Sequence, residues 1–268
     1  MTPPERRPPR FEGHRYPQII PDPDEIEMGL PAPWSVVSHR ANLTLELVAR
    51  RLAESHHLLN AELARERPEE FGLVADAAPT TIAHRSAVLV ALFEESGESH
   101  VVLTRRSYDM RSHRGEIAFP GGRSHGGETP TETALREAHE EVGLDPTTVT
   151  PFAWLSPIAT FASSSAIFPI VGLLPGRPEL VIEPSEVDRA FSVALSDLVA
   201  DEAFLEERWR HSLLRVGADE GGFFPIYFFK VPDDVIWGAT ARVLTELLSL
   251  VTGAPWPTHR DGQEQSRQ

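Results

Sequence analysis

The 268-residue chain contains no cysteine, which excludes disulfide bonds, thiolate metal ligands and a cysteine nucleophile. It also lacks any apolar run close to the roughly 20 residues that a membrane-spanning helix needs. Its first residues, MTPPERRPPRFEG, lack the apolar stretch of a secretory signal peptide. We therefore expect a soluble, cytoplasmic protein with no membrane partner.

Positive charge is scarce, because 25 Lys and Arg stand against 40 Asp and Glu and the formal net charge is -15. Sequence-independent binding to nucleic acid requires a basic face, so no nucleic-acid partner is expected. A small substrate that carries phosphate groups must instead be held by a local cluster of positive charge. With 41% hydrophobic residues, the chain can bury one sizeable core.

Composition divides the chain into four parts. Residues 1–34 hold nine of the 24 prolines, which favours a disordered or loosely docked segment. Leucines recur at helical spacing over residues 42–66, with a helical hairpin as the alternative around residues 55–60. This leucine stripe has to be buried against the core or against a second subunit, which leaves a homodimer open. We expect a Pro-rich arm at 1–34, a helical extension at 35–80, one catalytic domain at 81–253 and a polar tail at 254–268.

The catalytic domain reads as a mixture of strands and helices. Strands are expected at 87–93, 100–104, 152–155 and 167–174, a strand with a helical turn at 188–201, and a hairpin from 208–216 and 223–231. Asp233 or Asp234 is expected to cap a last helix that ends at Gly253. This order predicts an α/β protein in which helices enclose a mixed sheet.

The most informative stretch is GRSHGGETPTETALREAHEEVGL, at residues 122–144. Thr129 and Glu132 have the spacing of a capping box, and Pro130 takes the first helical position, where its missing N–H costs nothing. Gly143 ends the predicted helix.

Three glutamates, Glu137, Glu140 and Glu141, gather in the C-terminal half of this helix. Like charges four residues apart repel, and the helix dipole is unfavourable to acids there. A solvated acidic face is one interpretation. The other is a site for Mg²⁺ or Mn²⁺, because hard cations prefer clustered carboxylate oxygens on a rigid element.

Gly122, Glu128 and the run REAHEEVGL at 136–144 together resemble the Nudix box at every fixed position. The resemblance implies an α/β/α sandwich and hydrolysis of a nucleoside diphosphate linked to another group. It also implies roles for box residues: Glu137, Glu140 and Glu141 bind the metal, and Arg136 and Glu128 orient these acids. Glu140 and Glu141 are candidate general bases, with Glu186 as a weaker one.

The substrate has to be inferred from residues outside the box. The stretches LTRRS, MRSHRG and AFPGG, at 103–107, 110–115 and 118–122, resemble the extended motif of the coenzyme A diphosphatase branch, as does IWGATA at 236–241. Met110 replaces a more usual leucine, and Glu116 stands where glutamine is expected. This resemblance implies cleavage of coenzyme A or acyl-coenzyme A to 3′,5′-ADP and (acyl-)4′-phosphopantetheine.

Five arginines fall within residues 105–123 of this acidic chain, and planar guanidinium groups suit phosphate recognition. At least one of them is expected to pair with a nearby acid such as Glu116 or Asp109. The residues predicted to contact substrate are Arg105, Arg111, His113, Arg114, Phe119, Gly121 and Gly122. ADP-ribose or another nucleoside diphosphate derivative is the alternative substrate. A catalytically silent binding protein is the third reading, but it would be expected to lack box acids, and none is missing here.

Overall fold

The computed structural model describes residues 18–38, 40–55, 84–160, 165–210 and 222–254. Its elements are β1 (Glu25–Met28), the 3-10 helix η1 (Pro33–Val36), α1 (Leu45–Glu54), β2 (His84–Glu95), β3 (Glu98–Arg106), β4 (Ile117–Ala118), β5 (Gly121–Arg123), α3 (Pro130–Val142), β6 (Thr150–Trp154), β7 (Ile158–Thr160), β8 (Ser165–Leu173), β9 (Val187–Ala194), α4 (Leu195–Leu198), β10 (Phe204–Arg210), β11 (Phe224–Val231), β12 (Asp234–Trp237) and α5 (Gly238–Thr252). None of these helices is long and apolar enough to cross a membrane.

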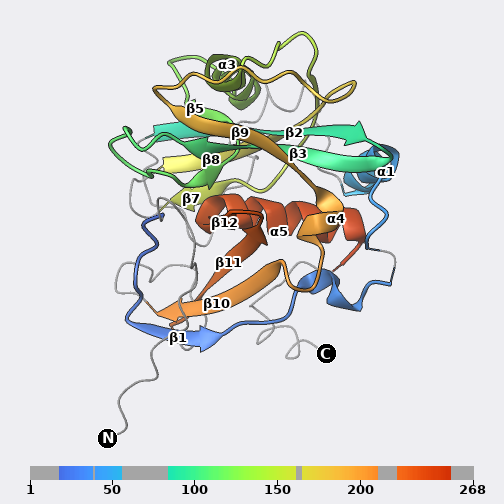
Figure 1. Cartoon of the computed structure of the whole chain (residues 1–268), viewed down its shortest axis with the longest axis vertical. Coiled ribbons are helices and arrows are strands. Elements are labelled where there is room, and N and C mark those ends of the chain that lie inside the picture. The colour runs from blue at the N-terminus through green and yellow to red at the C-terminus, as the bar shows by residue number, and fades with distance from the viewer. Residues whose placement is uncertain (1–17, 39, 56–83, 161–164, 211–221, 255–268) are drawn as a thin grey trace, which may run out of the picture.

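Helices and sheets stack in four layers (Figure 1). The eight-stranded sheet, here called the central sheet, follows the order β4-β3-β2-β8-β6, with β5 beside β2, β7 beside β8 and β9 beside β3. It is mixed, because β2 and β8 are parallel whereas β2 and β3 are antiparallel. α3 covers one face of this sheet and α5 lies under the other. The predicted α/β class, with a mixed sheet between helices, is confirmed.

A second, four-stranded sheet lies beyond α5 and has the order β1-β10-β11-β12 (Figure 1). All of its neighbouring strands are antiparallel. Here it is called the outer sheet. The prediction contained its β10–β11 hairpin, whose connecting residues 211–221 lie outside the described part of the chain, but it contained neither β1 nor β12.

The hairpin of β2 and β3 shows how the central sheet separates two cores. Its two-residue turn, Ser96 and Gly97, has φ angles of 55° and 83°, as a tight hairpin turn requires. Side chains alternate along β3: Val101 and Leu103 join the core on the α5 side, whereas Val102 joins the core under α3. Consecutive residues of β3 therefore serve opposite faces of the sheet.

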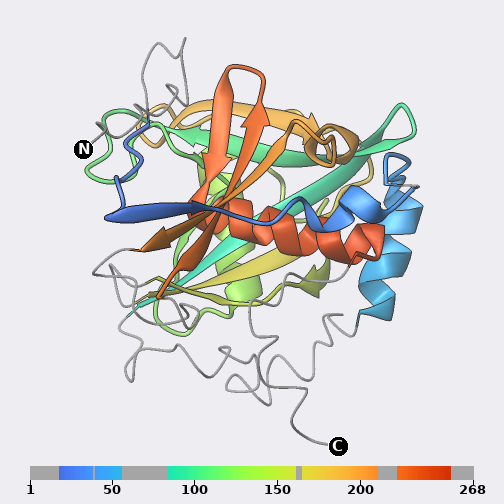
Figure 2. The same cartoon turned by 90° about the horizontal axis from the view of Figure 1, so that it is seen from below.

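The described part of the apolar stripe in the N-terminal extension is buried within the chain itself. α1 starts at Thr44, whose Oγ1 accepts a hydrogen bond from the Leu47 N–H at 3.3 Å. Val48 and Leu52 are fully buried in the core that contains α5, and α1 lies against that helix (Figure 2). The remainder of the helix expected at 42–66, and the alternative hairpin beyond Ser55, lie outside the described residues.

Part of the expected Pro-rich arm belongs to the folded structure. β1 pairs with β10 along its whole length, from Glu25 opposite Arg210 to Met28 opposite Glu207. Trp34 is fully buried, with its ring centroid 5.2 Å from that of Phe204. The description of residues 18–34 as loosely docked is therefore corrected, whereas residues 1–17 lie outside the described part.

The start of the last helix also differs from the prediction. Asp234 opens β12, which pairs with β11, and α5 begins only at Gly238 without a side-chain cap. Asp233 has a φ of 62° and forms the turn between these strands. The pairing of β12 with β11 overrides the local capping signal, while the end of α5 at Gly253 agrees with the prediction.

Candidate active site

α3 has the bounds and caps that its sequence predicts. The Glu132 N–H donates to Thr129 Oγ1 at 3.2 Å, and the Thr129 N–H donates to Glu132 Oε2 at 2.8 Å. Gly143 ends the helix in the left-handed conformation. Ala134, Ala138 and Val142 are fully buried against the central sheet. These local signals fix the axis and rotation of the helix, and so the directions of its acids.

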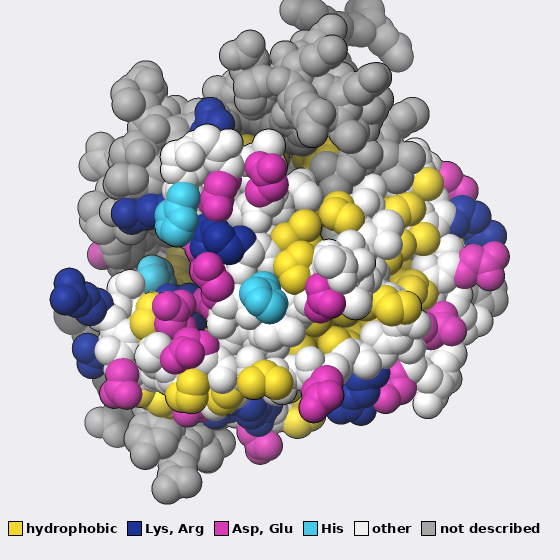
Figure 3. Space-filling view, turned by 90° about the horizontal axis from the view of Figure 1, so that it is seen from above, with side chains coloured by type: hydrophobic (Ala, Val, Ile, Leu, Met, Phe, Trp, Pro, Cys, Tyr) yellow, Lys and Arg dark blue, Asp and Glu magenta, His cyan; other side chains and the backbone are white. Residues whose placement is uncertain are grey.

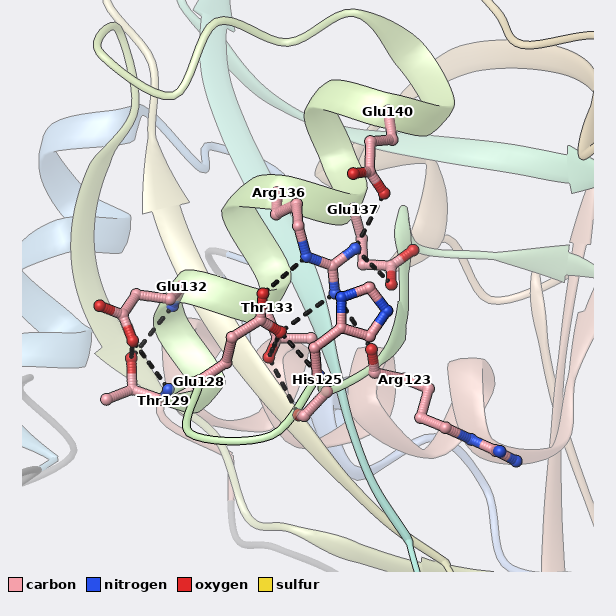
Figure 4. A network of polar contacts seen from close by, with 10 residues as sticks. Arg123, His125, Glu128, Thr129, Glu132, Thr133, Arg136, Glu137 and Glu140 are labelled. Carbon is pink, nitrogen blue, oxygen red and sulfur yellow. Dashed lines mark hydrogen bonds and ion pairs between the residues drawn. The ribbon is translucent and has the colours of Figure 1, made fainter.

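One guanidinium group holds three of the predicted acids (Figure 4). Arg136 donates from Nε to Glu128 Oε1 at 2.8 Å. Its Nη1 donates to Glu137 Oε1 at 2.9 Å and to Glu140 Oε2 at 2.8 Å. Its Nη2 reaches the carbonyl oxygen of Arg123 at 3.1 Å, which ties α3 to β5. Arg136 thus offsets part of the repulsion between neighbouring carboxylates.

Glu128 is the anchor of Arg136 in the turn before α3. Its carboxylate accepts hydrogen bonds from Arg136, from the His125 N–H at 2.9 Å and from Thr133 Oγ1 at 3.0 Å. Hydrogen bonding to Arg136, followed by that to His125, lowers the pKa of Glu128 to about 2. The carboxylate therefore stays charged at every pH at which such an enzyme is assayed.

Glu141 occupies a very different environment, with a side chain only 4% exposed. The Gly121 N–H donates to its Oε2 at 3.0 Å, and Arg106 Nη1 lies 3.7 Å from its Oε1. Burial raises the pKa of Glu141 to about 7, and the charges of Glu137 and Glu186 act in the same direction, against the opposing effects of Gly121 and Arg106. A carboxyl group with such a pKa can exchange a proton near neutral pH.

Glu137 lies between these two environments and packs against the glycine turn. A Cβ atom on Gly122 would come within 2.4 Å of Glu137 Oε2, so only glycine allows this approach. Burial raises the pKa of Glu137, while its hydrogen bond to Arg136 opposes the change. Gly121 and Gly122 were predicted to contact substrate, but in this structure both lie against the acids of α3.

The carboxylates of Glu137, Glu140 and Glu141 are suitable ligands for a divalent metal ion, although they do not converge on one point in this structure. Within the described ranges, no three acidic or histidine side chains are close enough together to hold a metal ion. Arg136 takes Oε1 of Glu137 and Oε2 of Glu140, which leaves the second oxygen of each carboxylate outside that contact. The three acids offer hard carboxylate oxygens on a rigid helix. The two less exposed ones, Glu137 and Glu141, also repel each other, which a cation would relieve. This set of ligands fits Mg²⁺ or Mn²⁺.

The loop between β3 and β4, at residues 107–116, carries three of the predicted substrate contacts. Arg111, His113 and Arg114 are all exposed. His113 Nδ1 lies 3.0 Å from Glu116 Oε2, and this contact raises the pKa of His113. Arg114 Nε donates to the Met110 carbonyl oxygen. Seen from the α3 side, acidic, basic and histidine side chains mix on one part of the surface, beside a group of hydrophobic side chains (Figure 3).

Two other predicted contacts point elsewhere. Phe119 is 3% exposed and packs in the core that contains α5, so its predicted role in substrate contact is corrected to a role in packing. The guanidinium of Arg105 pairs with Asp234 and lies 3.5 Å from Asp188. Arg105 is thus an arginine that pairs with acids, although its partners are not the predicted Glu116 or Asp109.

Arg106 is one of the five clustered arginines of the sequence but was not among the predicted site residues, although its Nη1 lies 3.7 Å from Glu141 Oε1. The signal was present, because Arg106 is the last residue of a strand whose side chains alternate between the two faces. Glu186 comes close through its backbone as well, since its carbonyl oxygen accepts a hydrogen bond from the Ser107 N–H at 2.8 Å. The acids of α3 thus meet the start of the 107–116 loop.

Comparison with known proteins identifies the family. The family model described as the NUDIX domain matches residues 83–214. Nudix hydrolase 3 of Caenorhabditis elegans is 32% identical over 62% of this chain and 72% of its own length. The uncharacterized Nudix hydrolase NudL of Photorhabdus laumondii is 35% identical over 56% of this chain and 76% of its own.

Two further proteins show how far the similarity extends. Nudix hydrolase 15, mitochondrial, of Arabidopsis thaliana is 32% identical, and the match covers 64% of this chain but only 60% of that protein. The crystal structure of the Nudix hydrolase RenU from M. smegmatis is 24% identical, with a TM-score of 0.39 over 44% of this chain and 74% of that one. The NUDIX domain matches, and the chain covers more than two thirds of the Caenorhabditis elegans and Photorhabdus laumondii relatives. The chain therefore belongs to the Nudix hydrolase family and is a hydrolase of pyrophosphate bonds.

Proposed function

We propose that the protein hydrolyses the diphosphate of coenzyme A or acyl-coenzyme A to 3′,5′-ADP and (acyl-)4′-phosphopantetheine. The observation that carries this proposal is the position of the 107–116 loop. The Ser107 N–H bonds to the Glu186 carbonyl at 2.8 Å, and the Arg106 N–H bonds to the Glu116 carbonyl at 3.0 Å. Exposed Arg111 and Arg114 therefore stand on a loop whose two ends meet at Arg106, and Arg106 Nη1 lies 3.7 Å from Oε1 of Glu141 on α3.

The charge of the substrate supports this choice. Coenzyme A carries a diphosphate and a separate 3′-phosphate, whereas ADP-ribose carries only the diphosphate. In a chain with a formal net charge of -15, a third phosphate needs positive charge beyond that required at the diphosphate. We propose that the exposed guanidinium groups of Arg111 and Arg114 meet that need, because one guanidinium group can donate two parallel hydrogen bonds to phosphate oxygens.

The proposed chemistry uses the acids of α3 and the arginine that holds them. Nudix hydrolases generally use divalent metal ions, and such an ion, held by Glu137, Glu140 and Glu141, would neutralise the diphosphate and acidify a bound water. Arg136 keeps Glu137 and Glu140 oriented. A carboxylate of the chain would take a proton from water while the water oxygen attacks one phosphorus; the bond from that phosphorus to the bridging oxygen would break, and the bridging oxygen would leave with the other phosphate.

Glu141 is the favoured general base, because its carboxylate is buried in the site and held by the Gly121 N–H at 3.0 Å, and because burial raises its pKa when no metal ion is bound. Glu140 is the alternative, with a side chain 56% exposed and one oxygen bound to Arg136. Glu186 remains the weaker candidate, because its hydrogen bond at the site is made by the backbone carbonyl, whereas its carboxylate acts on Glu141 through its charge.

A product assay tests the proposal. Purified protein is incubated with Mg²⁺ or Mn²⁺ and a panel of coenzyme A, acetyl-coenzyme A, ADP-ribose, a dinucleoside polyphosphate and an oxidised dNTP, and the products are separated. We expect 3′,5′-ADP from the coenzyme A substrates, at the highest kcat/KM of the panel. Faster hydrolysis of ADP-ribose would contradict the substrate assignment, and binding without any hydrolysis would favour a silent binding protein. The Glu141→Gln variant, purified in parallel, controls for contaminating phosphatases.

A further inference from the structure

A single buried carboxylate connects the outer sheet to the central sheet. Asp234 is the first residue of β12 and is 5% exposed. It lies beyond residues 83–214, which match the NUDIX domain. Its carboxylate pairs with Arg105 on β3, and Arg189 Nη2 on β9 lies 3.5 Å from Asp234 Oδ2. Arg105 and Arg189 are direct partners in the pairing of β3 with β9, so Asp234 bridges two adjacent strands of the central sheet.

The pairing with Asp234 matters most for Arg105, because this arginine is poorly solvated. The side chain of Arg105 is 17% exposed, and that of Arg189 is 39% exposed. Among the described residues, the Nε atoms of both arginines are buried without a hydrogen-bond partner. A partly buried guanidinium group that has lost its carboxylate is costly, so it moves toward solvent or toward another acid. Asp188 also lies 3.5 Å from Arg105 but is 41% exposed, so the conformation of Arg105 depends mainly on the buried partner, Asp234.

Arg105 is followed in the sequence by Arg106, which lies beside Glu141 of α3. Side chains alternate along β3, so Arg105 reaches Asp234 on the α5 side while Arg106 reaches Glu141 on the α3 side, at 3.7 Å. The register of β3 against β9 shifts between these two residues, because β9 carries one extra residue, Asp188, opposite them. Such irregularities re-aim a side chain and end the regular pairing of a strand. The 107–116 loop begins at this point.

We infer that Asp234 is a positioning residue of the active site. By holding Arg105, it fixes the irregular end of β3, which aims Arg106 at Glu141 and sets the start of the loop that carries Arg111 and Arg114. The outer sheet thereby takes part in the reaction without touching the substrate. The catalytic consequence rests on the proposed function, whereas the structural consequence does not.

Amide hydrogen exchange tests the structural consequence without any substrate. The Arg106 N–H bonds to the Glu116 carbonyl at 3.0 Å, and the Gly115 N–H bonds to the Arg106 carbonyl at 3.1 Å, so both amides report on the end of β3. In Asp234→Asn we expect both to exchange about tenfold faster or more than in the wild type. The matched control is Asp201→Asn, which removes the exposed pair between Arg40 and Asp201 and should leave both amides unchanged. Unchanged exchange in Asp234→Asn would overturn the inference.

Kinetics with coenzyme A test the catalytic consequence. Asp234→Asn should lower kcat by about tenfold while KM changes less, measured well below its Tm, whereas a purely structural role would lower only Tm. Arg106→Gln should also lower kcat. In the double variant, Asp234→Asn should lower kcat by less than about a further twofold, because both changes act through Arg106. Effects that multiply would contradict action through Arg106.

Two further outcomes are distinguishable. If Asp234→Asn does not fold, Arg105→Lys is used in its place. The lysine ammonium keeps a positive charge for Asp234 but cannot donate two hydrogen bonds as a planar guanidinium does, so faster exchange of the Arg106 and Gly115 amides is again expected. Unchanged exchange in this variant would overturn the inference. If no coenzyme A substrate is hydrolysed but these amides respond, the proposed function fails while the positioning role of Asp234 stands.

Discussion

The two longest described helices lie on opposite faces of the central sheet and are stabilised in opposite ways (Figure 1). α3 buries five of its thirteen residues, whereas α5 buries ten of its fifteen. α3 begins with a complete capping box, but α5 has no side-chain cap at its start. The helix that carries the acids thus depends on local contacts at its ends, and the other depends on burial.

The difference shows what a cluster of like charges requires. Glu137 and Glu141 are one helical turn apart near the negative end of the α3 dipole, which is unfavourable. The capping box, Gly143 and the Arg136 network oppose this cost. On α5, by contrast, the buried acid Glu246 accepts hydrogen bonds from the Ser156 N–H at 2.9 Å and from its hydroxyl at 2.7 Å, so its contacts serve packing. Variants of the two helices should therefore separate activity from stability.

The largest expected effect is on catalysis by α3. Glu141→Gln keeps the shape of the side chain and should lower kcat by about 10³ or more, because charge and metal effects dominate such sites. Its Tm in metal-free buffer should be unchanged or higher, since the buried charge and its repulsion of Glu137 are gone. Steady-state kinetics and thermal melts measure both, with Glu98→Gln in the β2–β3 hairpin as the control. Near-normal turnover with metal present would rule out a catalytic role for Glu141.

On α5 the balance should be reversed. Leu247 is fully buried, so Leu247→Ala is expected to lower the free energy of unfolding by about 2 to 5 kcal/mol through loss of packing. Below the melting temperature its kcat/KM should stay within about twofold of the wild type, because α5 carries no predicted catalytic group. Urea unfolding and steady-state kinetics on the same preparation measure the two effects. A large fall in kcat with unchanged stability would show that the two helices are less separate than proposed.

A smaller effect is expected at the start of α3. Thr129→Ala removes one half of the capping box and should cost about 0.5 to 2 kcal/mol of unfolding free energy. Thr131→Ala, at the second residue of the helix, leaves the cap intact and serves as the control. Equal stability of the two variants in urea would indicate that burial, and not the cap, holds α3.

The smallest expected effect is a pH dependence at Glu128. Its pKa is lowered to about 2 in the folded protein from an ordinary value near 4.5, so its contribution to stability is present above pH 4.5 and is lost as the pH falls towards 2. The wild type should therefore lose more stability than Glu128→Gln over that range. The two urea midpoints, measured at pH 7, 4.5 and 3, should converge on acidification. A constant difference would exclude this linkage.

The elements predicted best are those specified by neighbouring residues. The start, the end and the caps of α3 follow from spacings between residues close in sequence. β12 was missed because the chain has a capping aspartate there, and pairing with β11 overrode that signal. Arg105 and Asp234 are 129 residues apart, so nothing local to either position indicates that they pair. Burial of Phe119 likewise depends on where α5 packs.

The most direct test of the account compares coenzyme A with dephospho-coenzyme A, which lacks only the 3′-phosphate. We expect kcat/KM of the wild type to be about 10 to 100-fold higher for coenzyme A, the effect of one charge-assisted contact. Arg111→Ala or Arg114→Ala should remove that preference and spare the dephospho substrate. Equal rates for the two substrates in the wild type, or alanine variants that leave the coenzyme A rate within twofold, would contradict recognition of the third phosphate by the 107–116 loop.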